Sequence, residues 1–182
     1  MGERIILGNS NLGAAIQSRC PEFEIIGRPE YDLASKHDCD RVVIDHTPDI
    51  VINTVALNES HDAWEILSTN YVSSVYLTLS WLKKMSRGHI INISSASSYW
   101  TSWPDISDGR LSYNISKEAL SLFGKHVNRK IVDSSDVIIS TVELGSFSSK
   151  FNGYTGKMSL ERAADIVCSC VHHPLTSISC IK

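Results

Sequence analysis

The chain has 182 residues, of which 42% are hydrophobic and 20% are charged, a composition typical of one globular domain with a substantial core. Its 17 basic and 20 acidic residues leave a formal net charge of -3, which argues against a general nucleic-acid-binding surface. No apolar run approaches the length of a membrane span. We therefore expect a single domain over residues 1–182, with neither nucleic acid nor membrane as a partner.

The N-terminal residues lead directly into an apolar segment without the pattern of a secretory signal, which predicts a cytoplasmic protein. The five cysteines are odd in number and lack the spacing of zinc ligands, so we expect free thiols and no metal site. Cys168 and Cys170 are expected on the buried face of a helix, with His172 and His173 at its polar end. The other cysteines are Cys20, Cys39 and Cys180.

The first predicted element is a short apolar strand at residues 4–7, which ends at Gly8 and opens through a polar turn into a helix. Backbone N–H groups and the dipole of such a helix N-terminus form a seat for a pyrophosphate. An ordinary strand-to-helix turn, with glycine needed only for its backbone conformation, is the alternative. The residues expected in this turn are Gly8, Asn9, Ser10, Asn11, Leu12 and Gly13.

The second predicted strand, at residues 23–27, is followed by Arg28. In dinucleotide-binding folds an acidic residue at this point holds the ribose 2'-hydroxyl, whereas arginine accommodates a 2'-phosphate. Arg28 therefore favours NADP(H) over NAD(H), and a solvated surface arginine is the alternative. Residues 31–33 are predicted to be briefly extended, and residues 34–47 to form a surface helix that ends near Pro48. Because this connection is short, we expect a trimmed half of the sheet on this side.

Residues 49–56 form a continuous apolar run, typical of a strand buried on both faces of a parallel sheet. Asn53 is expected near its carboxyl end, where such sheets bind ligands. Residues 62–85 predict one long helix or two consecutive ones. Asn70 lies within it; asparagine is unfavourable inside helices, which indicates a polar role, and a solvated side chain is the alternative. The apolar stripe of this helix consists of Trp64, Leu67, Tyr71, Val75, Leu79 and Leu82.

Residues 88–98 form another buried strand, which brings Ser95 to the ligand edge of the sheet. The aromatic loop at residues 99–104 is interpreted as a pocket wall or as a cap on the core. Further strands are predicted at residues 136–142 and 177–181, and helices at residues 110–130 and 160–171. Because strands and helices alternate, the sequence predicts an α/β fold with a Rossmann-like, doubly wound, mostly parallel sheet in a single domain.

The helix predicted at residues 110–130 contains the residues that we expect to be catalytic. Tyr113 and Lys117 are four residues apart, so their side chains share one helix face. A phenol, with an ordinary pKa of about 10, is a poor acid-base group at neutral pH, but a neighbouring ammonium favours its ionised form. An aromatic side chain beside a solvated charge is the alternative.

Taken in order, these motifs resemble those of the short-chain dehydrogenases/reductases over nearly the whole chain. Tyr113-Asn-Ile-Ser-Lys117 matches the family's catalytic pair in full. The other similar segments are Gly8-x-x-x-x-Gly13 for its glycine turn, Asn53-Thr-Val-Ala56 for its Asn-Asn-Ala-Gly segment, Asn70 for the asparagine of its central helix, Asn92-Ile-Ser94-Ser95 for the strand with its serine, and Glu143-Leu144-Gly145 for its Pro-Gly turn. The chain departs from the family in a glycine-poorer turn, in Leu144 where proline is usual, and in a short segment at residues 146–159 where many members have a lid.

The resemblance implies an oxidoreductase that prefers NADP(H), acts on a carbonyl or secondary alcohol, and assembles as a homodimer or homotetramer through its two long helices. It implies Tyr113 as the acid-base residue and Lys117 as the residue that lowers its pKa and holds the nicotinamide ribose. Ser95 would polarise the substrate oxygen, and Asn70 would fix the helix backbone and a water. Further cofactor contacts are implied for Gly8, Asn9, Ser10, Asn11, Leu12, Gly13, Arg28, Asp32, Leu33, Asn53, Thr54, Val55, Leu144 and Gly145, and pocket lining for Trp100, Trp103, Phe147 and Phe151.

Two alternatives stay open. The glycine-poor turn and short lid segment are compatible with a nucleotide-binding regulator that kept the fold and lost turnover. Ser94-Ser95-Ala96 followed by Tyr99 also resembles the extended branch of the family, the nucleotide-sugar epimerases and reductases, but the sequence has no counterpart of their sugar-binding domain.

Overall fold

The structure is a computed structural model that describes residues 2–58, 62–96, 108–131, 135–150, 153–174 and 177–180. Six strands form one sheet in the order β2-β1-β3-β4-β5-β6, and each described strand pair is parallel. The predicted doubly wound sheet is therefore confirmed. The strands are β1 (Glu3–Leu7), β2 (Glu24–Ile26), β3 (Pro48–Asn53), β4 (Arg87–Ser95), β5 (Asp136–Leu144) and β6 (Ser177–Cys180).

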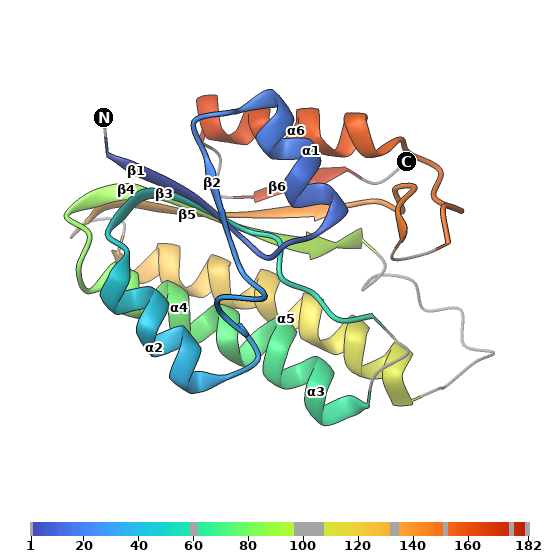
Figure 1. Cartoon of the computed structure of the whole chain (residues 1–182), viewed down its shortest axis with the longest axis horizontal. Coiled ribbons are helices and arrows are strands. Elements are labelled where there is room, and N and C mark those ends of the chain that lie inside the picture. Colours follow the sequence, from blue (N-terminus) through green and yellow to red (C-terminus); the bar gives the residue numbers. More distant parts are fainter. Residues whose placement is uncertain are drawn as a thin grey trace.

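Helices cover both faces of this sheet (Figure 1). On one face lie α1 (Asn11–Arg19) and α6 (Leu160–His172), and on the other lie α2 (Lys36–Asp45), α3 (Ala63–Leu67), α4 (Ser73–Leu82) and α5 (Asp108–Ile131). The core divides in the same way: one cluster contains Ile6 and Ile52, and the other contains Ile5 and Val51. Alternate residues of one strand thus serve opposite faces, which explains the continuous apolar runs in the sequence.

The order of the strands reverses at β1. β2 lies on one side of β1, and the chain then crosses to β3 on the other side. The carboxyl ends of β1 and β3 therefore flank a topological switch point, where open α/β sheets bind ligands. No described strand lies beyond β2, which confirms the trimmed half. The piece predicted to be extended at residues 31–33 forms no strand: Leu33 belongs to a turn, and Tyr31 and Leu33 pack in the core cluster that includes Val42 of α2.

The helix predicted at residues 62–85 is continuous but changes its winding. A π-helical turn, η1 (Ser68–Val72), stands between α3 and α4. A π-turn contains one residue more than an α-turn and so rotates the residues that follow it around the axis. The predicted apolar stripe faces the core only in part: Trp64 is 80% exposed and Leu79 is 38% exposed, whereas Leu82 packs against the core cluster. The buried face instead carries Ile66, Thr69, Asn70, Ser73, Ser74, Leu77, Thr78 and Trp81.

The thiols lie in the core. Cys20, Cys39, Cys168 and Cys170 are free thiols, as predicted, and all four are buried, which was predicted for Cys168 and Cys170. The side chain of Cys180 lies outside the described part of the chain. His172 and His173 are exposed at the end of α6, also as predicted. Among the described residues, no group of histidine, cysteine and acidic side chains has an arrangement that could hold a metal ion. The described helices include none that is long and apolar enough to cross a membrane.

Candidate active site

The carboxyl ends of β3, β4 and β5 form one polar edge of the sheet, because the strands are parallel and in register. Asn53 on β3 pairs with Asn92 on β4, and their side-chain amides share a hydrogen bond of 3.2 Å. Asn92 in turn donates to the hydroxyl of Thr78 on α4, at 3.5 Å. These buried amides hold the sheet edge to the helix layer below it.

Tyr113 and Lys117 lie one turn apart on α5, as their spacing predicts. The Lys117 Nζ is 5.9 Å from the centroid of the Tyr113 ring and donates to the Ile93 carbonyl of β4 at 3.0 Å. Lys117 is only 3% exposed, and this burial lowers the pKa of its ammonium to about 8. Tyr113 is partly exposed, so a ligand can reach it. The pair therefore joins a buried cation to an accessible phenol.

Asn70 is fully buried in the π-helical turn and connects two other segments. Its Oδ1 accepts from the Leu57 backbone N–H at 2.6 Å, and its Nδ2 donates to the Leu57 carbonyl at 2.9 Å. The same Nδ2 also donates to the Ser116 hydroxyl at 3.2 Å, and Ser116 donates to the Tyr113 carbonyl at 2.7 Å. Asn70 thus links the loop after β3 to the helix turn that carries Tyr113, so the alternative of a solvated side chain is wrong.

The serines at the end of β4 have different surroundings. Ser95 is the last residue of the strand and is partly exposed, whereas Ser94 is buried. Ser94 donates to the Lys117 carbonyl at 2.7 Å, and Ser121 donates to the Ser94 hydroxyl at 2.9 Å. These contacts fix α5 against β4 beside Lys117. Sequence reasoning missed Ser94, Ser116 and Ser121 as site residues, because an isolated serine on a strand or a helix carries no signal of its partners.

The turn after β1 has the backbone that its sequence predicts. Gly8 has a φ of +95°, a backbone conformation that residues other than glycine rarely adopt. Ser10 caps α1 by accepting from the Gly13 N–H at 3.0 Å, and its hydroxyl lies 3.0 Å from that of Thr54, with which it shares a hydrogen bond. A Cβ at Gly13 would lie 2.9 Å from the Gly8 carbonyl oxygen, so glycine is required there as well. Ser10 replaces the middle glycine of a Gly-x-Gly-x-x-Gly turn and strengthens it by capping the helix.

A cavity of about 170 Å³ opens at this switch point. A Cβ at Gly8 would lie 3.2 Å from Val55 Cγ2, and one at Gly27 would lie 3.2 Å from the Asn9 nitrogen. A side chain at either position would therefore crowd a residue that lines the cavity. The Thr69 hydroxyl is buried at the cavity without a hydrogen-bond partner among the described residues. These features fit one part of a nucleotide cofactor. The lining residues are Gly8, Asn9, Ser10, Gly27, Arg28, Tyr31, Asp32, Leu33, Ala34, Thr54, Val55, Ala56, Leu57 and Thr69.

Several predicted contact residues do not line this cavity. The side chains of Leu12 and Leu144 pack in the core cluster between the sheet and α1 and α6, and Asn53 turns inward to Asn92. Phe147 also packs against that core cluster, on the side of α6. The other predicted residues outside the cavity lining are Asn11, Gly13, Tyr113, Lys117 and Gly145. Trp100, Trp103 and Phe151 lie outside the described residues.

Arg28 and Asp32, four residues apart in the sequence, form an ion pair at the cavity. The Arg28 guanidinium donates to Asp32 Oδ1 from Nη2 at 2.9 Å and from Nε at 3.2 Å. Their side chains are 67% and 46% exposed, so water screens the pair. A phosphate would therefore compete with the Asp32 carboxylate for this guanidinium.

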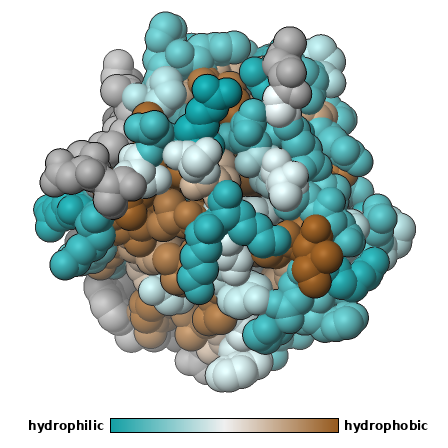
Figure 2. Space-filling view, turned by 90° about the vertical axis from the view of Figure 1, so that its left-hand side faces the viewer, coloured by the Kyte–Doolittle hydropathy of each residue, from teal (hydrophilic) through white to brown (hydrophobic). Residues whose placement is uncertain are grey.

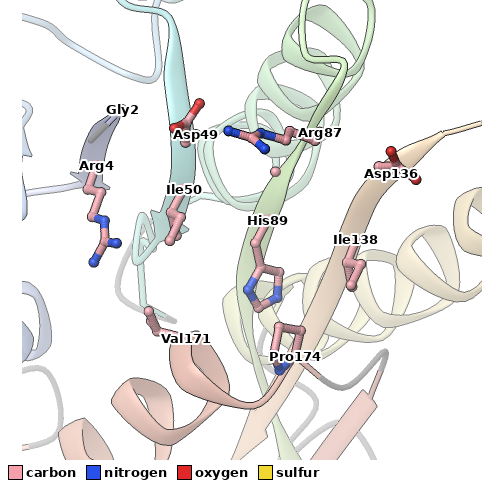
Figure 3. Close-up of a pocket in the computed structure, with 11 residues that line it drawn as sticks. Gly2, Arg4, Asp49, Ile50, Arg87, His89, Asp136, Ile138, Val171 and Pro174 are labelled. Carbon is pink, nitrogen blue, oxygen red and sulfur yellow. The ribbon is translucent and has the colours of Figure 1, made fainter.

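A larger cavity, of about 590 Å³, lies at the opposite edge of the sheet, at the amino ends of the strands (Figure 3). Figure 2 shows this end of the molecule, where apolar surface lies among polar residues. Arg4 and Arg87 are accompanied by Asp49 and Asp136, so the charges of the lining balance. It contains none of the residues predicted for catalysis or cofactor binding, and the chemistry is therefore better assigned to the carboxyl edge.

No protein-family model matches the chain, and neither does any curated protein. Among solved structures, a short chain dehydrogenase from Burkholderia cenocepacia in complex with NADP has a TM-score of 0.83 at 15% identity, over 100% of this chain and 89% of that one. Serine dehydrogenase from Escherichia coli has a TM-score of 0.74 at 17% identity, over 98% and 97% of the two chains. 4-Hydroxyisoleucine dehydrogenase complexed with NADH has a TM-score of 0.78 at 14% identity, over 97% and 96%. At these identities the likeness concerns the fold.

Proposed function

We propose that this chain, which has the fold of the short-chain dehydrogenases/reductases, is an NAD(P)-dependent oxidoreductase acting on a carbonyl compound or secondary alcohol. The observation that carries the proposal is the buried Lys117 ammonium 5.9 Å from the Tyr113 ring, at the sheet edge that also holds the switch-point cavity. A protein that only binds nucleotides has no need of a desolvated lysine beside a phenol. Solved dehydrogenases with this fold, named for complexes with NADP or NADH, add support.

In the proposed reaction, a bound nicotinamide supplies or accepts the hydride. The Tyr113 hydroxyl donates a proton to the substrate oxygen during carbonyl reduction and takes it back during alcohol oxidation. Lys117 holds its positive charge beside the phenol and so stabilises the phenolate formed when that proton leaves. Ser95, at the end of β4, would hydrogen-bond the same oxygen, and Asn70 keeps the Tyr113 turn in position through Ser116.

For the cofactor, we propose NADP(H) as the preferred form and NAD(H) as the weaker one. Arg28 lines the cavity and is largely exposed, so its guanidinium can exchange the Asp32 carboxylate for a 2'-phosphate. The same carboxylate can accept a hydrogen bond from a ribose 2'-hydroxyl, which keeps NAD(H) binding within reach. The preference is therefore a modest one.

Titration of the protein with NADPH and NADH tests both points. We expect NADPH to bind more tightly, and an Arg28→Gln variant to lose about tenfold in NADPH affinity because one charge-assisted contact is removed. Its NADH affinity should stay within about twofold. Arg19→Gln is the matched control, since Arg19 pairs with Asp165 of α6 and does not line the cavity.

The same titration, followed by a panel of small aldehydes, ketones and secondary alcohols, separates the functional classes. Turnover supports the oxidoreductase. Binding without turnover would favour the regulator, and absence of binding to either cofactor would refute both.

We also propose that the chain forms a homodimer or homotetramer through the outer faces of α4 and α5. Val72 on η1 and Leu79 on α4 are exposed. On the adjacent α5, exposed apolar side chains are Leu111, Ile115 and Leu122, so apolar surface remains on neighbouring helices. Light scattering should give at least twice the monomer mass, and Leu122→Glu should shift it towards the monomer. A monomeric parent protein at micromolar concentration would contradict the assignment. Ile44→Glu, on the exposed face of α2, is the control.

A further inference from the structure

The hydroxyl of Thr69 differs from the other buried hydroxyls of its helix. Ser73 donates to the Ser68 carbonyl at 3.0 Å, and Ser74 donates to the Asn70 carbonyl at 2.9 Å, the usual way in which a helical hydroxyl is satisfied. Thr78 receives a hydrogen bond from Asn92 at 3.5 Å. Thr69 is 5% exposed, yet its Oγ1 has no partner among the described residues. A buried hydroxyl without a partner is unfavourable unless something else supplies one.

The surroundings of Thr69 indicate what that partner is. Thr69 lines the switch-point cavity, on the π-helical turn next to Asn70. The Asn70 side chain holds both backbone groups of Leu57, which lines the same cavity, so the wall around the hydroxyl is firmly positioned. The lining also contains the apolar side chains of Leu33, Val55, Ala56 and Leu57. Its other hydroxyls already have partners: Ser10 bonds Thr54, Thr54 donates to the Leu7 carbonyl, and Tyr31 donates to Asp45. Among the described residues that line the cavity, Arg28 is the single cation, and it is engaged with Asp32.

A lining in which apolar side chains accompany one hydroxyl that has no partner among the described residues suits a flat heterocycle better than a phosphate, which needs cations or several N–H groups. We propose that Thr69 binds the adenine of the cofactor, with Oγ1 hydrogen-bonded to the edge of the base. The inference rests on the proposed function and assigns a cofactor-positioning residue that the sequence motifs do not contain. It also accounts for the unsatisfied Oγ1, because the base supplies the missing partner.

The test compares Thr69→Val and Thr69→Ser with the parent protein in titrations with AMP, nicotinamide mononucleotide and NADPH. For Thr69→Val, which keeps the shape of the side chain and removes its hydroxyl, we expect the dissociation constants of AMP and NADPH to rise about three- to tenfold. The constant for nicotinamide mononucleotide should not change. Thr69→Ser keeps the hydroxyl and should stay within about twofold of the parent for all three ligands.

Urea unfolding of the ligand-free proteins provides a second readout. Thr69→Val removes an unsatisfied hydroxyl, so its unfolding midpoint should equal or exceed that of the parent. Thr78→Val is the matched control on the same helix: it removes the hydroxyl that accepts from the buried Asn92 Nδ2, so it should lower the midpoint and leave AMP affinity unchanged. Loss of ligand affinity without loss of stability is a pattern that a merely structural threonine does not produce.

The outcomes are distinguishable. If the parent binds AMP and NADPH and Thr69→Val binds them equally well, the inference is wrong and the proposed function stands. If Thr69→Val lowers the unfolding midpoint as Thr78→Val does, the hydroxyl has a structural partner within the protein, and the inference is again wrong. If the parent binds none of the nucleotides, the proposed function fails and this assignment fails with it.

Discussion

Replacing Tyr113 by phenylalanine should lower kcat/KM for carbonyl reduction by about 10²- to 10⁴-fold, the usual contribution of a general acid. The change removes one hydroxyl from a partly exposed side chain, so the fold and the switch-point cavity should remain intact. The NADPH dissociation constant should accordingly stay within about twofold. Steady-state kinetics on a substrate found in the carbonyl panel, with a fluorescence titration of NADPH, measure the two quantities.

Tyr76→Phe is the matched control for this experiment. The Tyr76 hydroxyl, on α4, donates to Asp40 on α2, and Tyr76 does not line the switch-point cavity, so the kinetics of this variant should equal those of the parent. Undiminished turnover in Tyr113→Phe would exclude Tyr113 as the acid-base residue. Parallel loss of turnover and NADPH binding would instead point to damage of the site as a whole.

Replacing Lys117 by methionine should abolish most turnover and at the same time change how stability depends on pH. Burial lowers the pKa of Lys117 from 10.5 to about 8. Below pH 8 both the folded and the unfolded chain carry the ammonium, and the cost of burying it is fully present. Between pH 8 and 10.5 the unfolded chain binds more protons than the folded one, so this cost is relieved as the pH rises.

The parent should therefore gain stability relative to Lys117→Met across that window, by about 3 kcal/mol if each pKa unit corresponds to about 1.4 kcal/mol. Urea unfolding of both proteins at pH 7, 8, 9 and 10 gives the difference. Lys125→Met, at an exposed position of the same helix, should show no such trend. If the difference in unfolding free energy between Lys117→Met and the parent does not change with pH, the folded protein does not lower the pKa of Lys117.

The sheet was predictable because its strands are buried on both faces. In such strands nearly every residue must be apolar, and the runs around Ile5, Val51 and Ile91 stand out from any other segment of the sequence. The Tyr113–Lys117 pair could also be predicted, since residues four apart on a helix must share a face. Local rules therefore sufficed for the elements and for this pair.

Local sequence patterns did not predict the direction in which individual side chains point. Asn53 and Leu144 occupy motif positions, yet the first bonds Asn92 and the second packs in the core, because strand alternation decides which face a residue serves. The Asn70–Ser116 hydrogen bond joins residues 46 positions apart, which no local pattern encodes. The π-helical turn was not predicted either, because the sequence pattern of residues 68–72 gives no sign of the one extra residue in that turn.

The trimmed side of the sheet bears on how a ligand would act on the protein. β2 has three residues and a single strand neighbour, and residues 28–34, which form one wall of the switch-point cavity, follow directly from it. Short edge elements with few ladder hydrogen bonds are the parts of a fold that open first. A ligand that contacts both Arg28, next to this strand, and Thr69 would stabilise β2 in its folded position. Cavity occupancy and the protection of the β2 amides from hydrogen exchange should therefore rise together.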